Sequence, residues 1–136
     1  MAGSRRQALL GPTIVAGTVA AGVLALSARD PHDAGSWGRC PLLQLTGVYC
    51  PFCGGLRAVN DLTSLDLVAA AASNLLLVAL LPLTVLMWGR WARSAWRGTP
   101  LNGSPHTRRL VGAGLVVLVA AFTIARNTSA GGWLAP

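Results

Sequence analysis

The sequence predicts an all-α membrane protein with three transmembrane helices and one short interfacial amphipathic helix. Of its 136 residues, 53% are hydrophobic and only 11% are charged, whereas soluble domains carry about 25% charged residues. The mean hydropathy is +0.55. Three long runs, 7–28, 67–89 and 110–125, contain no charged residue. We therefore expect a single membrane domain over residues 1–136, with the lipid bilayer as its main partner.

The first two runs are long enough to cross the hydrocarbon core, which takes about 20 helical residues. They predict helices over 8–28 and 66–89. The first run also exceeds the roughly 7–15 apolar residues of a secretory signal peptide. We therefore expect a retained anchor, with a cleaved signal peptide as the alternative. Inside the second helix, Pro82 lacks a backbone donor and predicts a kink.

The third helix is predicted over 110–126, followed by a tail, 127–136. Its uncharged run is short for a span. Arg109 and Arg126 flank it, however, and their long side chains can reach outward to both interfaces and extend the span.

The distribution of arginine predicts the orientation. All eleven basic residues are arginine, and seven of them fall in the N-terminal tail and in the connection 90–109, where there is no acid. The other connection, with the C-terminal end of the third helix, holds four arginines and all four aspartates. By the positive-inside rule the N-terminus is cytoplasmic and the C-terminus extracytoplasmic, in a bacterial plasma membrane. The net charge of +7 then reflects membrane orientation, and we expect no nucleic-acid partner because the arginines form no basic stripe.

The long connection between the first two helices has two parts. Residues 29–53 contain several prolines and glycines and read as an irregular extracytoplasmic loop. Over 55–64, leucine and valine recur every three residues between polar ones, which predicts a short amphipathic helix in the interface. Thr63 and Asp66 have the spacing of a capping box at the start of the second membrane helix.

Three cysteines in this loop carry the chemistry of the chain: Cys40, and Cys50 and Cys53 in a Cys-Pro-Phe-Cys-Gly string. A disulfide from Cys40 to either of the others would order the loop and contribute about 3 kcal/mol. A redox pair Cys50/Cys53 is the second interpretation, since a helix start and Arg57 would stabilise a thiolate, although no thioredoxin-like pattern surrounds it. A metal site is the third, with His32 as a distant fourth ligand.

Several polar residues have two interpretations each. Arg57 is expected to pair with Asp61 one helical turn away, or to bind a lipid phosphate or an anionic partner. Asn74, inside the second membrane helix, is expected to make an interhelical hydrogen bond or to line a cavity. Arg126 and Asn127 are expected to anchor the third helix at the interface. We assign no catalytic residue beyond the redox candidates and expect no cofactor.

The cysteine string resembles the bacterial membrane proteins grouped as domain of unknown function 2752. The resemblance covers about residues 37–130, and it implies a small multi-helix membrane protein without implying an activity. The sequence departs from the family pattern at Leu56, Asn60 and Leu65, where threonine, histidine and glycine are common. The matching residues are Cys40-Pro41, Thr46-Gly47, Cys50 to Gly54, Arg57-Ala58, Asp66, Asn74-Leu75 and Arg126-Asn127.

These features favour a small integral membrane component that is not an enzyme. Its cysteine-ordered outer loop would dock a partner or lipid. A membrane thiol-disulfide oxidoreductase using Cys50 and Cys53 is the alternative, and a cysteine-based metal-binding module is the second alternative. Three helices bury little apolar surface of their own, so a membrane-protein partner or self-association is also expected.

Overall fold

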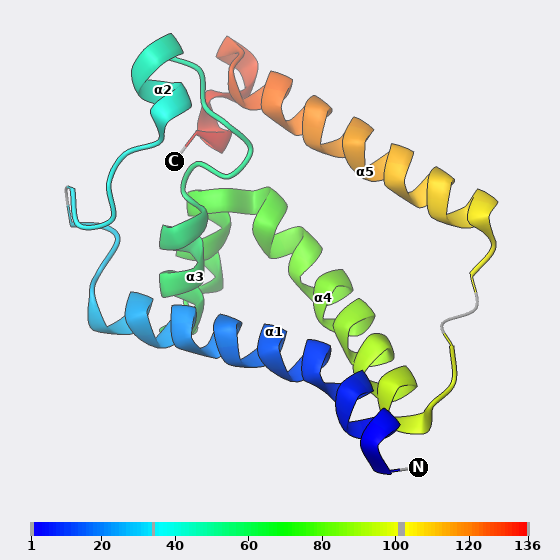
Figure 1. The fold of residues 1–136 in the computed structure, drawn as a ribbon. Helices are drawn as coiled ribbons and strands as arrows, with labels where there is room; N and C mark the ends of the chain where they lie inside the picture. Colours follow the sequence, from blue (N-terminus) through cyan, green and yellow to red (C-terminus); the bar gives the residue numbers. More distant parts are fainter. Residues whose placement is uncertain (1, 34, 101–102, 136) are drawn as a thin grey trace.

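The computed structural model describes residues 2–33, 35–100 and 103–135. The described residues leave out Met1, Ala34, residues 101–102 and Pro136. Both ends of the predicted domain 1–136 therefore lie outside the described residues. The described chain is all-helical, which confirms the predicted fold class. Its elements are α1 (Ala2–Ala28), α2 (Pro41–Thr46), α3 (Gly55–Thr63), α4 (Leu67–Arg97), α5 (Pro105–Arg126) and the 3-10 helix η1 (Ser129–Leu134) (Figure 1).

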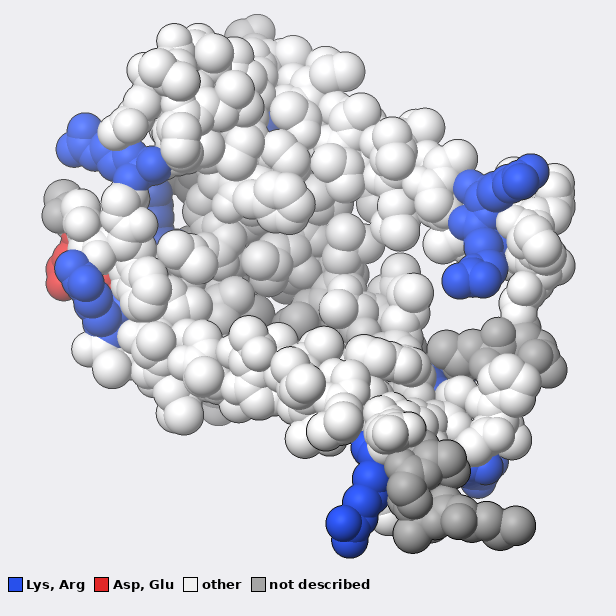
Figure 2. Space-filling model, in the orientation of Figure 1, with Lys and Arg blue, Asp and Glu red and all other residues white. Residues whose placement is uncertain are grey.

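Three helices are long and apolar enough to cross a membrane. These candidate spans are Arg6–Ala28, Leu67–Arg97 and Pro105–Arg126, with mean hydropathies of 2.0, 2.1 and 1.8. Figure 1 shows the N-terminus near the end of α4, whereas the C-terminus lies near α2. The face in Figure 2 carries its arginines near the ends of the helices, with an uncharged surface between them. The chain is therefore a multi-pass membrane protein.

The helices extend beyond the boundaries that hydropathy predicted. The first begins at Ala2 rather than residue 8, α4 continues to Arg97 rather than 89, and α5 begins at Pro105 rather than 110. The predicted connection 90–109 is correspondingly shorter. Hydropathy marks where lipid ends, but a helix continues until a stop signal. For α4 that signal is Gly98, which adopts a left-handed conformation and donates to the carbonyl of Ser94.

Two short helices occupy segments that were predicted to be irregular. The loop 29–53 contains α2, which begins with Pro41 in its first turn and ends at the left-handed Gly47. The tail 127–136 contains η1, whose first turn is capped by the Thr128 side chain accepting from Gly131 N. Both turns have local capping signals but no periodicity, because six residues are too few to show one.

The short helix α3 follows its predicted range within one residue, and it contacts both α1 and α4. It buries its small and polar side, including Ala58 and Asp61, whereas Leu56 is exposed. A helix between lipid and protein can direct leucine outward, because the bilayer is as apolar as a protein core. The exposed Leu56 therefore lies away from the packing of α3 on α1 and α4.

Helix α4 breaks at Asn74 and not at Pro82. Asn74 has extended dihedral angles, φ −160° and ψ 93°, and it is the residue with non-helical geometry inside the helix; Figure 1 shows α4 changing direction. The Asn74 Oδ1 accepts a hydrogen bond from Leu77 N at 2.9 Å, which caps the second part of the helix. Asp66 caps the first part by accepting from Ala69 N at 2.9 Å, so Asp66 and not Thr63 is the capping residue.

Helix α5 is joined to the rest mainly at its C-terminal end. It contacts η1, and its most apolar stretch has no buried residue. In contrast, α1 packs on α4 near the N-terminus, where Trp88 Nε1 donates to the carbonyl of Pro12 at 3.2 Å. The open side of α5 is therefore surface that lipid or protein must cover in the membrane.

Candidate functional site

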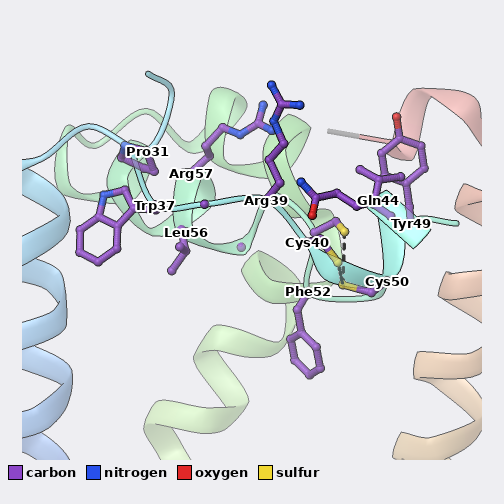
Figure 3. Close-up of a pocket in the computed structure, with 15 residues that line it drawn as sticks. Pro31, Trp37, Arg39, Cys40, Gln44, Tyr49, Cys50, Phe52, Leu56 and Arg57 are labelled. Atoms are coloured by element: carbon purple, nitrogen blue, oxygen red, sulfur yellow. Dashed lines mark hydrogen bonds between the residues drawn. The ribbon is translucent and has the colours of Figure 1, made fainter. Parts of the chain in front are cut away.

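The three cysteines form a compact thiol cluster although ten residues separate Cys40 from Cys50. The Cys50 sulfur lies 3.5 Å from that of Cys40 and 3.2 Å from that of Cys53, and all three sulfurs lie within 4.8 Å of one another (Figure 3). All three are free thiols. A disulfide has a sulfur–sulfur distance of about 2.05 Å, so the expected disulfide is absent from this structure.

Local backbone structure positions each thiol. Cys40 immediately precedes Pro41, at the start of α2. Cys50 and Cys53 belong to one tight turn, in which Cys53 N donates to the carbonyl of Cys50 at 3.1 Å. Gly54 follows with φ 79°, a left-handed conformation that favours glycine. The turn thus leads directly into α3, and the Cys-x-x-Cys-Gly string is a structural knuckle.

Two buried side chains from the membrane helices hold the carbonyls of this knuckle. The Asn74 amide donates to Pro51 O at 2.9 Å and to Cys53 O at 3.0 Å. Arg126 donates through Nη1 to Cys50 O at 2.9 Å and through Nη2 to Cys53 O at 3.3 Å. Each of these side chains is only 1% exposed. The knuckle is therefore fastened to α4 and α5, which are otherwise separate helices at this level.

Asn127 fastens the segment before the knuckle. Its side chain accepts from Tyr49 N and donates to Tyr49 O, both at 2.9 Å. The amide side chain thus bonds both the N–H and the C=O of one residue, as a neighbouring β-strand would, and this fixes the backbone there. Asn127 is thus bonded to the loop that bears Cys50. Arg126, which was expected to be an interfacial anchor, is buried in the protein instead.

Arg126 brings a buried positive charge next to the thiols. Its guanidinium carbon lies 4.9 Å from the Phe122 ring centroid and 5.8 Å from that of Tyr49. It also donates to Leu134 O at 3.0 Å, and its Nε has no hydrogen-bond partner. The one salt bridge among the described residues lies elsewhere. A buried charge without a counter-ion is costly, so an anionic group beside Arg126 would stabilise its guanidinium.

The thiols have different proton affinities. The pKa of Cys40 is lowered to about 7, first by a hydrogen bond from the backbone of Leu43 and then by the thiols of Cys53 and Cys50. The pKa of Cys53 is raised to about 12, first by burial and then by the thiols of Cys50 and Cys40. Cys40 is therefore the thiol that is partly ionised at neutral pH.

The aspartate expected to pair with Arg57 has other partners. Asp61 is buried and accepts from Ser73 Oγ at 2.8 Å, while its other oxygen lies 2.8 Å from His32 Nε2. His32 is therefore bonded to Asp61 and is not part of the thiol cluster. Asn60 donates to Leu26 O at 2.8 Å. Contacts of this kind, between residues far apart in the chain, leave no signal in a single sequence.

A pocket of about 670 Å³ opens beside the thiols (Figure 3). Arg39 and Arg57 line it from the loop and from α3, and no aspartate does. Arg39 was missed in the sequence, although its place next to Cys40 could have indicated it. The other lining residues are Pro31, Trp37, Gly38, Cys40, Leu43, Gln44, Tyr49, Cys50, Phe52, Cys53, Gly54, Gly55 and Leu56.

The fold and the site define a multi-pass helical membrane protein with a three-thiol cluster held at one end of its helices. Residues 40–88 match the family described as Protein of unknown function (DUF2752), the family that the chain resembles. The matched range contains the thiol cluster, α3 and the broken part of α4. No curated protein and no solved structure matches the chain.

Proposed function

We propose that this membrane protein binds a thiophilic divalent metal ion, of the zinc class, through Cys40, Cys50 and Cys53. The observation that carries the proposal is the approach of three free sulfurs to within 4.8 Å of one another. In a tetrahedral zinc–thiolate site the bonds are about 2.3 Å long, which separates the sulfurs by about 3.8 Å. The Cys40–Cys50 and Cys50–Cys53 sulfur–sulfur distances, 3.5 and 3.2 Å, are close to that spacing.

The charge near the cluster supports a divalent ion. Three thiolates around one divalent cation carry a net charge of −1, which the buried Arg126 would compensate. A monovalent ion such as Cu⁺ would leave a charge of −2. Soft thiolate ligands suit both zinc and Cu⁺, and the charge match with Arg126, the buried arginine bonded to the carbonyls of Cys50 and Cys53, favours the divalent ion.

The surroundings support a site with an open position. Among the described residues no fourth histidine, cysteine or carboxylate joins the cluster, and the pocket adjoins all three cysteines. Structural zinc sites have four protein ligands, whereas sites with three keep one position for water or another ligand. Asn74 and Arg126 donate hydrogen bonds to the carbonyls of the knuckle. These bonds would hold the cysteine ligands in position around the metal ion.

Cobalt loading of the purified full-length chain tests the proposal. Under reducing conditions we expect about one equivalent of Co²⁺ with thiolate charge-transfer absorption, displaced by Zn²⁺. C50S should weaken binding by more than about 100-fold, because a second-shell change alone costs about 10–100-fold. The matched control is L45S, which places serine at an exposed position of α2 in the same loop. The proposed site would be refuted if C50S bound cobalt as the unmodified protein does.

A second candidate function is thiol–disulfide exchange. The Cys50 sulfur contacts both others, so the Cys40 thiolate could attack the Cys50 sulfur of a Cys50–Cys53 disulfide. The Cys40–Cys50 bond would form as the Cys50–Cys53 bond breaks, and Cys53 would leave as a thiolate and take up a proton. Forming the first bond releases two protons and two electrons, which a membrane quinone would accept. Alkylation of intact cells with and without reductant separates the two functions: a reducible disulfide pool supports exchange, whereas fully alkylated thiols under both conditions contradict it.

We further propose that the N-terminus is cytoplasmic and the C-terminus extracytoplasmic in a plasma membrane, and that protein covers the open side of α5. The arginine count supports the orientation, and the unburied apolar stretch of α5 supports association. A membrane-impermeant thiol reagent should label the cysteines in intact, reduced cells. Protection of the cysteines there would reverse the orientation, and a monomer by light scattering in detergent would contradict self-association.

A further inference from the structure

The pocket beside the thiols also carries two arginines, which the metal site does not use. We infer that it binds a phosphate group through Arg39 and Arg57, and that the favoured source of this group is a phospholipid headgroup. The two arginines come from different elements, the loop before α2 and helix α3. Figure 3 shows both side chains extending to the same side of the pocket. Neither is a thiol ligand, so the inference does not depend on the metal.

The charge of the pocket is uncompensated by the protein. Two guanidinium groups line it, no aspartate or glutamate does, and the one salt bridge in the described ranges joins His32 to Asp61. Two positive charges facing one space attract an anion, and the attraction is stronger where protein walls limit access of water. The part of the pocket formed by Arg39 and Arg57 therefore favours an anionic ligand.

Three of the four aspartates have other partners. Asp61 is held by Ser73 and His32. Asp66 caps α4 through Ala69 N. Asp30 accepts from His32 N at 2.8 Å. An arginine whose expected intrahelical partner is bonded to other groups is available for a ligand.

The shape and position of the pocket indicate a phosphate at the membrane surface. Its volume, about 670 Å³, lies within the 300–1,000 Å³ typical of small-molecule sites. Apolar groups line it as well, including Trp37, Leu43 and Leu56. It is formed where helix α3 meets the loop at one end of the spans, which is the level of lipid headgroups. Guanidinium forks match phosphate oxygens in bidentate geometry.

Lipid binding to the full-length chain tests this inference. The protein, delipidated in neutral detergent, is titrated with phosphatidylglycerol, and bound lipid is counted by native mass spectrometry. We expect about one retained lipid, with affinity reduced by at least about ten-fold in R39Q/R57Q, because hydrogen bonds to charged groups are lost. Diacylglycerol, which has the same tails and no phosphate, should not be retained.

Controls separate the pocket from general surface charge. R29Q removes an arginine at the same end of the molecule but outside the pocket lining, and it should leave the affinity within about two-fold. Competition by inorganic phosphate would identify the free anion as sufficient, whereas its failure to compete would identify the lipid. The inference would be overturned if R39Q/R57Q bound phosphatidylglycerol as tightly as the unmodified protein. It would also be overturned if R29Q lost as much affinity as R39Q/R57Q, or if diacylglycerol were retained.

Two measurements keep the outcomes interpretable. Circular dichroism of each variant should show unchanged helix content, since Arg39 is exposed and Arg57 only partly covered. Removing metal with a chelator should leave phosphatidylglycerol affinity within about two-fold. Failure of the metal site and failure of the phosphate site would thus be seen separately.

Discussion

Asn74 joins the broken helix to the cysteine knuckle, and its replacement by alanine is the most informative single perturbation. The amide makes three hydrogen bonds: it donates to Pro51 O and Cys53 O and accepts from Leu77 N. Because the side chain is 1% exposed, water cannot replace these bonds directly. We expect N74A to loosen the knuckle and the second part of α4 together.

The magnitude follows from the groups that would be left without partners. Cys53 O keeps its bond to Arg126, so the two stranded groups are Pro51 O and Leu77 N. A buried group without a partner costs about 1–3 kcal/mol, and loss of a helix cap costs about 1 kcal/mol as part of the same effect. Two such groups predict that N74A lowers the free energy of unfolding by about 2–6 kcal/mol.

Equilibrium unfolding in mixed micelles, followed by circular dichroism, measures this change. The variant N74D separates the two roles, since aspartate keeps the acceptor for Leu77 N but loses the donors to the knuckle. The matched neighbour is L75A, at an exposed position, for which we expect a change below about 0.5 kcal/mol. Cobalt affinity should fall in both Asn74 variants, because both release the knuckle.

The reasoning would be refuted if N74A unfolded like the unmodified protein, or if L75A cost as much as N74A. Recovery of both stability and cobalt affinity in N74D would show that the cap alone matters. Asn74 would then have no role in holding the cysteines.

Three further predictions concern backbone geometry and thiol ionisation. Leu65 has φ 59°, so L65G should stabilise the fold by up to about 1 kcal/mol, and thermal unfolding that shows a loss would contradict the strain. A side chain at Gly131 would overlap the backbone at the end of α5, whereas one at Gly132 meets nothing; G131A should therefore lower the unfolding midpoint and G132A should not. In metal-free protein, the alkylation rate of Cys40 should rise with pH, reach half of its maximum near pH 7 and level off above it, because its pKa is about 7 and only the thiolate reacts. Cys53, with its pKa raised to about 12, should remain slow through neutral pH, and faster alkylation of Cys53 than Cys40 at pH 7 would contradict these values.

Leu65 also shows how a departure from a family pattern gains meaning from structure. The sequence has leucine where relatives commonly have glycine, and the structure places that residue in the left-handed region. It connects α3 to α4 through a tight turn, in which Asp66 N donates to Asp61 O at 3.0 Å. The chain thus tolerates a strained leucine where glycine would be relaxed.

Some parts of the site were predictable because their signal is local. The Cys-x-x-Cys spacing and the following glycine indicate a turn that brings two sulfurs together, and the structure has that turn. The cap at Asp66 is equally local. The convergence of Cys40 with this turn was not predictable, since it depends on the path of α2. Pro82 shows that a local signal can also mislead. It predicted a kink, but it lies inside a continuous part of α4, and the helix breaks at Asn74 instead.

The sequence by itself determined the solvent of this protein and the number of its spans. Hydropathy and charge depend on residue type alone, so three apolar runs predict three membrane helices without any knowledge of packing. Only the tertiary structure decided what the polar residues in and beside those helices do. Asn74, Arg126 and Asn127 lie far from the cysteines in sequence, yet all three bond the backbone of residues 49–53. Because a buried hydrogen bond depends on where two chain segments meet, its partners appear only once the chain is folded.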